Sequence, residues 1–235
     1  MPAHNEQDYL EAAVDEVVKG LRDRALPFEV LVCENGSTDH TMEVATTLTG
    51  RFPEVRLLSL PHADYGRALR AGFLAATGAI VANFDVDGVD LDFLDAALVR
   101  LQEGGSVAAV VASKRGPGSH DTRRAGRRLV TAAFSLVLRR GFGLSVSDTH
   151  GMKVLGRCQL TLLVDACRYG TDLFDTELLI RAERAGFTVA EIPVEIVDLR
   201  PPRTPIWSRI PRSLVGLGRL RLTLWRERRS DHRPG

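Results

Sequence analysis

The 235-residue sequence has few cysteines and aromatic residues, and it lacks long apolar runs. Its three cysteines, Cys33, Cys158 and Cys167, are odd in number and lack the paired spacing of a metal site, so a closed disulfide framework is excluded and a reducing compartment is favoured. The longest apolar runs, such as residues 129–138, are about ten residues long and too short to cross a bilayer. No charged start followed by an apolar stretch indicates a secretory signal. We therefore expect a cytoplasmic protein that is soluble or bound peripherally to the inner face of a membrane.

Positive charge gathers in two parts of the chain, although the net charge is only +1. Residues 200–235 contain ten arginines against Glu227 and Asp231, and a second basic cluster lies between Lys114 and Arg128. Such segregation favours an acidic partner, namely phosphate groups, an anionic membrane surface or nucleic acid. A solvated charged surface is the alternative. No nucleic-acid-binding motif accompanies the arginines, so DNA or RNA is the least favoured partner.

Short apolar segments alternate with helical patterns through the first half of the chain. We expect strands at 28–33, 55–60, 79–84 and 107–113. We expect helices after Asn5 as N-cap and at 38–49, 65–77 and 91–103, and later at 123–140 and 172–185, followed by short strands near 187–198. This alternation predicts an α/β fold with a mostly parallel central sheet covered by helices on both faces.

The first strand of this pattern is almost missing. The chain opens on Pro2 to Glu6, and a helical pattern follows at once. A parallel sheet normally carries an apolar strand before such a helix. We therefore expect four to six apolar residues upstream of Met1, so that Met1 is not the natural start.

Two acidic loops follow expected strands. Asp85 and Asp87 come directly after 79–84, at the kind of strand end where open α/β sheets bind ligands. Carboxylates there suit Mg²⁺ or Mn²⁺, which would bridge the phosphates of a nucleotide diphosphate. The loop Glu34 to Asp39 follows 28–33, and its polar side chains suit a ligand or simply a tight turn. A helix cap is the alternative for the first loop, and Asp90 fits that role.

Several ordered segments resemble known proteins. PAHNE at 2–6, ENGSTD at 34–39, DYGRALRAG at 64–72 and ATGAIVANFDVD ending at Asp87 resemble the family-two glycosyltransferases. Segments 148–153, 175–177 and 192–195, with Arg200, resemble the polyprenyl-phosphate sugar synthases of the dolichyl-phosphate mannose synthase group. The resemblance covers roughly residues 1–205. It implies a GT-A-type fold and inverting transfer from a GDP-mannose or UDP-glucose type donor to an acceptor, most often a polyprenyl phosphate, with Mg²⁺ or Mn²⁺.

The resemblance also implies roles for individual residues. The donor site would comprise Pro2, Ala3, Glu6, Glu34, Asn35, Asp39 and Asp85, and the metal would be held by Asp85 and Asp87. Asp148 would lie at the reaction centre, Arg115 would offset phosphate charge, and Glu177 is the second candidate base. Arg200, Arg123 and Lys153 would bind the acceptor phosphate.

The acceptor half departs from the pattern of these synthases. The stretch from Arg200 to Ile206 lacks the usual Gly and Lys, and the block at Asp148 is one residue shorter, with His150 before Gly151. Transfer to a soluble hydroxyl acceptor therefore stays an alternative, and so does a catalytically silent nucleotide-sugar-binding protein. A hydroxyl acceptor would need a general base, for which Asp148 comes first and Glu177 second. A sugar nucleotidyltransferase would need a Gly-rich basic loop at the start, which the segment 4–6 does not supply.

The basic C-terminal segment 206–235 is expected to form an amphipathic helix. Ile210, Leu214, Leu217 and Leu224 recur at helical spacing, with arginines mostly on other sides. One interpretation is an interfacial helix on anionic lipid that is separable from a catalytic domain at 1–205. The other is a helix that packs its apolar side onto that domain.

Overall fold

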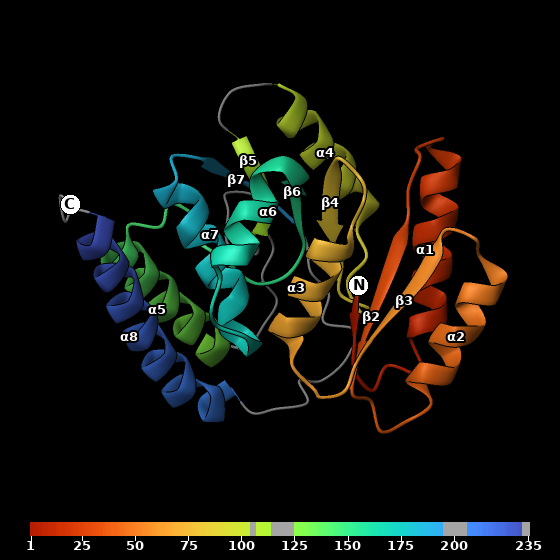
Figure 1. Cartoon of the computed structure of the whole chain (residues 1–235), viewed down its shortest axis with the longest axis horizontal. Helices are drawn as coiled ribbons and strands as arrows, with labels where there is room; N and C mark the ends of the chain where they lie inside the picture. Colours follow the sequence, from red (N-terminus) through yellow and green to blue (C-terminus); the bar gives the residue numbers. More distant parts are fainter. Residues whose placement is uncertain (104–106, 114–124, 195–205, 232–235) are drawn as a thin grey trace.

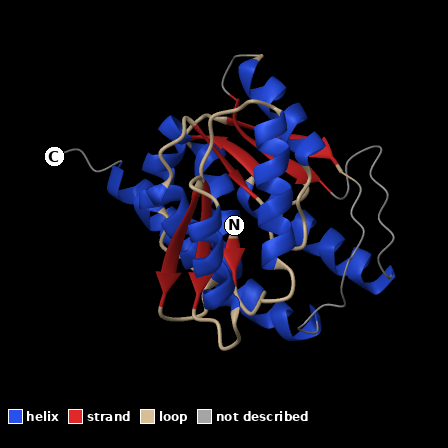
Figure 2. Ribbon diagram, turned by 90° about the vertical axis from the view of Figure 1, so that its right-hand side faces the viewer, coloured by secondary structure: helices blue, strands red, loops and turns tan. Residues whose placement is uncertain are grey.

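The computed structural model of the chain describes residues 1–103, 107–113, 125–194 and 206–231. Two sheets lie next to one another (Figures 1 and 2). The first has the order β1 (Pro2–Ala3), β2 (Val30–Asn35) and β3 (Val55–Leu60), and its pairs are parallel. The second has the order β4 (Ile80–Asn83), β6 (Lys153–Gly156), β5 (Val107–Ser113) and β7 (Thr188–Pro193).

Strand β6 runs antiparallel to both of its neighbours, so the second sheet is mixed. Its first residue, Lys153, lies opposite Asn83 of β4 and Val111 of β5, near the carboxyl ends of those two strands. The chain therefore enters β6 from the edge of the sheet at which parallel strands end. As a result, the segment before β6, which includes Asp148 and His150, lies at the same edge as Asp85.

Eight helices of the described ranges surround the sheets. They are α1 (Leu10–Asp23), α2 (Thr41–Arg51), α3 (Tyr65–Ala75), α4 (Leu91–Gln102), α5 (Ala125–Phe142), α6 (Arg157–Ala166), α7 (Phe174–Arg184) and α8 (Ile206–Asp231), with a 3₁₀ turn η1 (Thr171–Leu173). The expected helices are confirmed to within a few residues at their ends. Helix α6 was not expected, because it has no clear apolar stripe and exposes Leu162.

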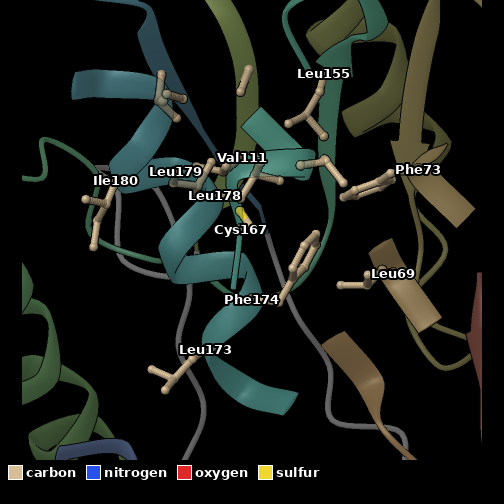
Figure 3. Close-up of a cluster of buried hydrophobic side chains, with 14 of the residues drawn as sticks. Leu69, Phe73, Val111, Leu155, Cys167, Leu173, Phe174, Leu178, Leu179 and Ile180 are labelled. Atoms are coloured by element: carbon tan, nitrogen blue, oxygen red, sulfur yellow. The ribbon is translucent and has the colours of Figure 1, made fainter. Parts of the chain in front are cut away.

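Apolar side chains form one core on each face of the sheets, as the two-sided burial of the strands predicts. In β5, Ala109 and Val111 point to the core that α3, α6, α7 and α8 cover, whereas Val110 and Ala112 point to the core under α1, α2 and α4. Figure 3 shows part of the first core, where the ring of Phe174 faces Phe73 at 6.0 Å between centroids. The predicted covering of both faces by helices is confirmed.

The start of α1 differs from the sequence prediction. The helix begins at Leu10, and Asn5 is not its cap but lies in the left-handed region with φ of 56°. Asparagine tolerates this conformation better than most residues. Its Oδ1 accepts a hydrogen bond from the backbone N–H of Thr38. Asn5 therefore joins two loops rather than capping a helix, whereas Asp90 caps α4 as expected, by accepting from the N–H of Phe93.

Helix α8 packs onto the rest of the protein. Leu217, Leu220 and Leu224 are buried in the first core, and the hydroxyl groups of Thr223 and Tyr169 lie 2.9 Å apart. Gly216 lets the helix approach closely, because a Cβ there would lie 2.1 Å from Leu173 Cδ1. The packing interpretation therefore holds for Leu217 and Leu224 of the expected stripe, and these two side chains are not free to enter lipid.

One member of the expected stripe does not take part in this contact, and another is not described. Leu214 is exposed, and the side chain of Ile210 lies outside the described part of the chain. None of the helices in the described ranges combines the length and hydropathy of a membrane span. A domain boundary at 205 stays a prediction, but removal of 206–235 would uncover core residues and is now expected to destabilise the protein.

The packing of α8 predicts the result of a pair of substitutions on this helix. Leu220→Ala should lower the free energy of unfolding by about 2–5 kcal/mol, because it opens a cavity in the core. Leu222→Ala, whose side chain is 55% exposed, should change it by less than about 0.5 kcal/mol. Urea unfolding followed by circular dichroism measures both. Equal small effects would show that α8 does not pack on the core.

Candidate active site

The carboxyl ends of β1 and β2 are joined by the side chain of Asn35. Residues Ala3 and Glu34 are register partners, and the Nδ2 group of Asn35 donates to the carbonyl of Ala3 at 3.0 Å. The Oδ1 atom of Asn35 accepts from the backbone N–H of Asp64, which caps α3. Asn35 is thus buried at the junction of three loops. Both polar atoms of its side-chain amide form hydrogen bonds to the protein backbone.

The acidic loop after β2 forms the turn that its residue types suggest. Gly36 has φ of 64°, and a Cβ at this position would lie 2.9 Å from the backbone N of Ala63, so the turn requires glycine. Glu34 is 2% exposed, and its carboxylate accepts from Ser37 N–H and from the Ser59 hydroxyl. Glu34, expected in the donor site, therefore stabilises the turn and presents no free oxygen to a ligand.

Asp39 holds the neighbouring loops together. Its Oδ1 accepts from the N–H and the hydroxyl of Thr41, and its Oδ2 lies 3.4 Å from the N–H of Gln7. Burial acts to raise the pKa of Asp39, but these hydrogen bonds outweigh it and lower the pKa below its ordinary value. Glu6, which is 8% exposed, contributes through its backbone N–H to the Thr41 hydroxyl. Pro2, Ala3, Glu6 and Asp39 therefore lie around one corner of the sheet edge, as expected.

Asp85 and Asp87 lie at the end of β4. The N–H of Gly88 donates to the carbonyl of Asp85, and this turn leaves Asp87 exposed. The hydroxyl of Tyr65 donates to Oδ1 of Asp85 at 3.0 Å. Burial raises the pKa of Asp85, while the positive charge of Lys153 and the Tyr65 hydrogen bond act against this rise. The fold therefore brings both acids to the edge where the donor loops meet.

A buried ion pair lies close to Asp85. Lys153 and Asp175 are each 1% exposed, and Lys153 Nζ lies 3.1 Å from Asp175 Oδ1 and 2.7 Å from the carbonyl of Gly151. Burial acts to raise the pKa of Asp175, but the charge of Lys153 and the neighbouring His150 lower it overall. Lys153 was expected to bind the acceptor phosphate. Because Lys153 is buried and paired with Asp175, it instead holds the Asp175 side chain in place.

Asp148 and His150 stand beside this pair. Asp148 Oδ1 accepts from the N–H of His150, and the N–H of Asp148 is held by Glu191 of β7. The ring of His150 stacks on Phe134 of α5, and its Nδ1 lies 3.7 Å from Asp175 Oδ2. Burial acts to lower the pKa of His150, but the nearby carboxylate of Asp175 raises it overall. Asp148 therefore lies beside His150 at the edge of the sheet where Asp85 also lies, and its role at a reaction centre stays a prediction.

Glu177 does not face this site. It is fully buried, and its Oε2 accepts from the N–H groups of Arg168 and Tyr169. Its Oε1 forms an ion pair with Arg181 at 2.8 Å. Because every oxygen is engaged away from the sheet edge, Glu177 is a structural residue rather than a base.

The remaining expected residues are Arg115, Arg123 and Arg200, which lie outside the described residues. Sequence reasoning missed Tyr65 and Asp175 as site residues. Tyr65 had a usable signal, since it is a polar aromatic residue at the start of α3, in the region that follows the carboxyl end of β3. Asp175 lies in the segment 175–177 that carries the resemblance, but its role depends on Lys153, a buried partner on a different element.

The two acids of the β4 loop fit a divalent cation. No group of three or more His, Cys, Asp and Glu side chains is placed to hold a metal ion within the described ranges. Mg²⁺ is often held by only one or two carboxylates, with water and substrate phosphates completing its shell. An exposed Asp87 two residues from a fixed Asp85 matches that donor set.

Comparison with known proteins shows which proteins the chain is similar to. The chain is 31% identical over 234 residues to glycosyltransferase AglD of Haloferax volcanii, which covers 96% of this chain but only 36% of AglD. It is 28% identical to the dolichyl-phosphate beta-glucosyltransferase ALG5D of Trichomonas vaginalis, over 96% of this chain and 74% of that protein. The chain thus spans about a third of AglD and about three quarters of ALG5D.

A shorter relative matches end to end. An uncharacterized glycosyltransferase of Mycobacterium tuberculosis is 35% identical over 92% of this chain and 90% of its own length. Among solved structures, glucosyl-3-phosphoglycerate synthase of the same organism, in complex with Mn²⁺, UDP and phosphoglyceric acid, shares the fold with a TM-score of 0.69. It is 23% identical and is matched over 94% of this chain and 76% of that chain. The family model of glycosyl transferase family 2 matches residues 1–161. The chain therefore belongs to glycosyltransferase family 2.

Proposed function

We propose that this protein transfers a sugar, with inversion, from a nucleotide-diphosphate sugar to the phosphate of a polyprenyl lipid. The observation that carries the proposal is the meeting of two groups at one sheet edge. Asp85 and Asp87 lie at the end of β4, and Asp148 with His150 lies just before the antiparallel strand β6. The dolichyl-phosphate beta-glucosyltransferase relatives support the choice of acceptor.

The donor half of the site is built from backbone and fixed side chains. Asn35 and Glu34 hold the loops. Asp39 would contact the base of the donor, and Glu6 would line the nucleotide site. Asp85 and Asp87 would hold Mg²⁺ or Mn²⁺, which when bound offsets the charge of the departing diphosphate. Tyr65 orients Asp85 by its hydrogen bond. Since these groups are fixed before the donor arrives, little of its binding energy is lost in ordering them.

The acceptor half suits an anionic nucleophile. A phosphate monoester is mostly ionised at neutral pH, because its second pKa is about 6. It attacks the anomeric carbon without giving up a further proton, so no strong base is required. Asp148 then orients the acceptor, and the neighbouring His150 can form a hydrogen bond to the phosphate.

A hydroxyl acceptor is the second candidate. The neighbouring fold of glucosyl-3-phosphoglycerate synthase is crystallised with phosphoglyceric acid, a soluble compound. In that case Asp148 has to take the hydroxyl proton as a general base. A catalytically silent binder is the third candidate, and it would bind the donor without releasing nucleotide diphosphate.

The exposed side of α8 supports a peripheral membrane contact for the lipid acceptor. Its apolar residues Leu214, Val215, Leu222 and Trp225 are all about half-exposed, and arginines flank them. Each surface arginine contributes about 1 kcal/mol on anionic lipid. The buried side of the same helix keeps the catalytic body attached to that surface.

Substitution of the exposed acid tests the metal assignment. Asp87→Asn should remove the Mn²⁺-dependent part of UDP or GDP binding, because one of two carboxylate ligands is lost. Asp39→Ala should weaken nucleotide binding but keep its dependence on metal. Calorimetry with and without Mn²⁺ separates the two effects. Asp92→Asn, at a fully exposed acid of α4, is the matched control. Full metal-dependent binding by Asp87→Asn would contradict the assignment.

The acceptor class is tested with Asp148→Asn and two acceptors. UDP-glucose and GDP-mannose are supplied in turn with polyprenyl phosphate in detergent or with 3-phosphoglycerate. With polyprenyl phosphate, we expect product and less than about a tenfold loss of kcat in the variant. A loss of about 10²–10⁴-fold with a hydroxyl acceptor would assign Asp148 as general base. Donor binding with no product from either acceptor would identify a silent binder.

Membrane contact predicts co-sedimentation. The full chain should pellet with vesicles that contain an anionic lipid, and less so as salt rises, because the arginine contribution is screened. Leu222→Ser with Trp225→Ser should reduce pelleting, whereas Leu162→Ser on α6, also exposed, should not. If the full chain ignores the vesicles at low salt, a soluble acceptor becomes the better proposal.

A further inference from the structure

A large cavity lies away from the acids of the proposed active site. Its volume is about 940 Å³, and it is bounded by α3, the segment 167–173 and α8. Neither Asp85 nor Asp87 lines it. A cavity of this size is at the upper end of the range for small-molecule sites, which is about 300–1,000 Å³.

Positive charge dominates the wall of this cavity. Four arginines line it, namely Arg67, Arg70, Arg168 and Arg219, against the single acid Asp64. Asp64 is already engaged, since its Oδ1 accepts from the N–H groups of Arg67 and Thr171. The arginines therefore outnumber the carboxylates that are placed to neutralise them.

Arg70 carries a buried donor that the protein leaves unmet. Its Nε–H group is buried and has no hydrogen-bond acceptor among the described residues. The same guanidinium reaches Asp165 only at 3.6 Å, and that carboxylate is largely exposed. Buried polar groups are nearly always hydrogen-bonded, so an unmet donor in a cavity wall points to a ligand that accepts from it.

The other three arginines are weakly held. Arg67 lies 3.6 Å from Asp64 Oδ2, a long ion pair on the surface. Arg168 shares Glu227 with Arg181, which binds the same carboxylate through two nitrogens. No acid of the described ranges lies within ion-pair distance of Arg219. Arg70 and Arg219 are thus the two whose charges are least neutralised by the described residues.

We propose that this cavity binds a phosphate-bearing ligand through Arg70 and Arg219, at a site separate from the donor site. Guanidinium groups match phosphate in geometry as well as in charge. Apolar side chains, including Leu74 and Val215, line the rest of the cavity and suit the uncharged part of such a ligand. Close packing of Gly216 on Leu173 fixes one wall, so the cavity exists before the ligand binds.

The inference does not depend on the proposed function, but the two sites adjoin. Asp64 faces the cavity, and its N–H is held by Asn35 on the donor side. Tyr65, the next residue, reaches Asp85. The phosphate group has two potential sources, a soluble ester or a lipid headgroup, and both present the same anion to the arginines.

Calorimetry on the full chain with inorganic pyrophosphate tests the site. EDTA is present throughout, so that metal-dependent binding at Asp85 and Asp87 does not contribute. We expect wild-type binding that weakens as salt rises. Arg70→Gln and Arg219→Gln should each weaken it by about tenfold, the change expected for one charge-assisted hydrogen bond. Arg100→Gln, at an exposed arginine of α4, and Asp87→Asn should leave it unchanged.

A second arm uses short-chain phosphatidic acid below its micelle concentration. Binding of this lipid but not of pyrophosphate, with the same loss in Arg70→Gln, supports the site and identifies a lipid phosphate. Binding of pyrophosphate alone supports a soluble ester. The proposal is overturned if neither probe binds the wild type, or if both arginine variants bind like the wild type. Should Arg70→Gln fail to fold, Arg219→Gln on the exposed side of α8 decides the matter.

Discussion

The buried pair of Lys153 and Asp175 is the interaction on which the candidate site depends. Both side chains are almost fully removed from water, and a buried charge is tolerated only when it is paired. The pair joins β6 to the first turn of α7, directly beside Asp85. Its positive partner favours the ionised form of Asp85, and its negative partner favours the charged form of His150. Loss of either member would leave the other charge uncompensated in the core.

Around this pair, the protein joins two sheets that each supply half of a site. The parallel sheet supplies the loops after β1 and β2, and the mixed sheet supplies the Asp85 loop and the segment before β6. Two hydrogen bonds connect the halves, from Asp64 N–H to Asn35 and from the Tyr65 hydroxyl to Asp85. Both come from adjacent residues at the start of α3. The beginning of that helix therefore sets the distance between the donor loops and the β4 acids.

Local patterns predicted much of this arrangement. Strands β3 and β5 were predicted at their observed bounds, because continuous apolar runs between polar turns leave little choice of boundary. The position of Asp85 at a strand end followed from the same reasoning. The resemblance to family-two glycosyltransferases showed that the segments follow one another in the order of a known family. Periodicity alone does not reveal this.

The features that sequence reasoning missed are those that depend on distant partners. Lys153 reads as a residue for the acceptor phosphate until Asp175 is placed against it. Glu177 reads as a candidate base until Arg181 and two backbone N–H groups enclose it. The antiparallel direction of β6 follows from where the chain re-enters the sheet rather than from its four residues. The apolar stripe of α8 was visible, but its partner, the core or a lipid surface, was not.

The central claim is that a nucleotide and a divalent cation bind together at the end of β4. Paramagnetic broadening of backbone amide signals by Mn²⁺ in the presence of UDP tests this most directly. The account predicts that the signals of Val86, Asp87 and Gly88 disappear first, followed by that of His150, while those around Arg100 persist. Broadening that is centred elsewhere, or that does not require the nucleotide at low Mn²⁺, would contradict it.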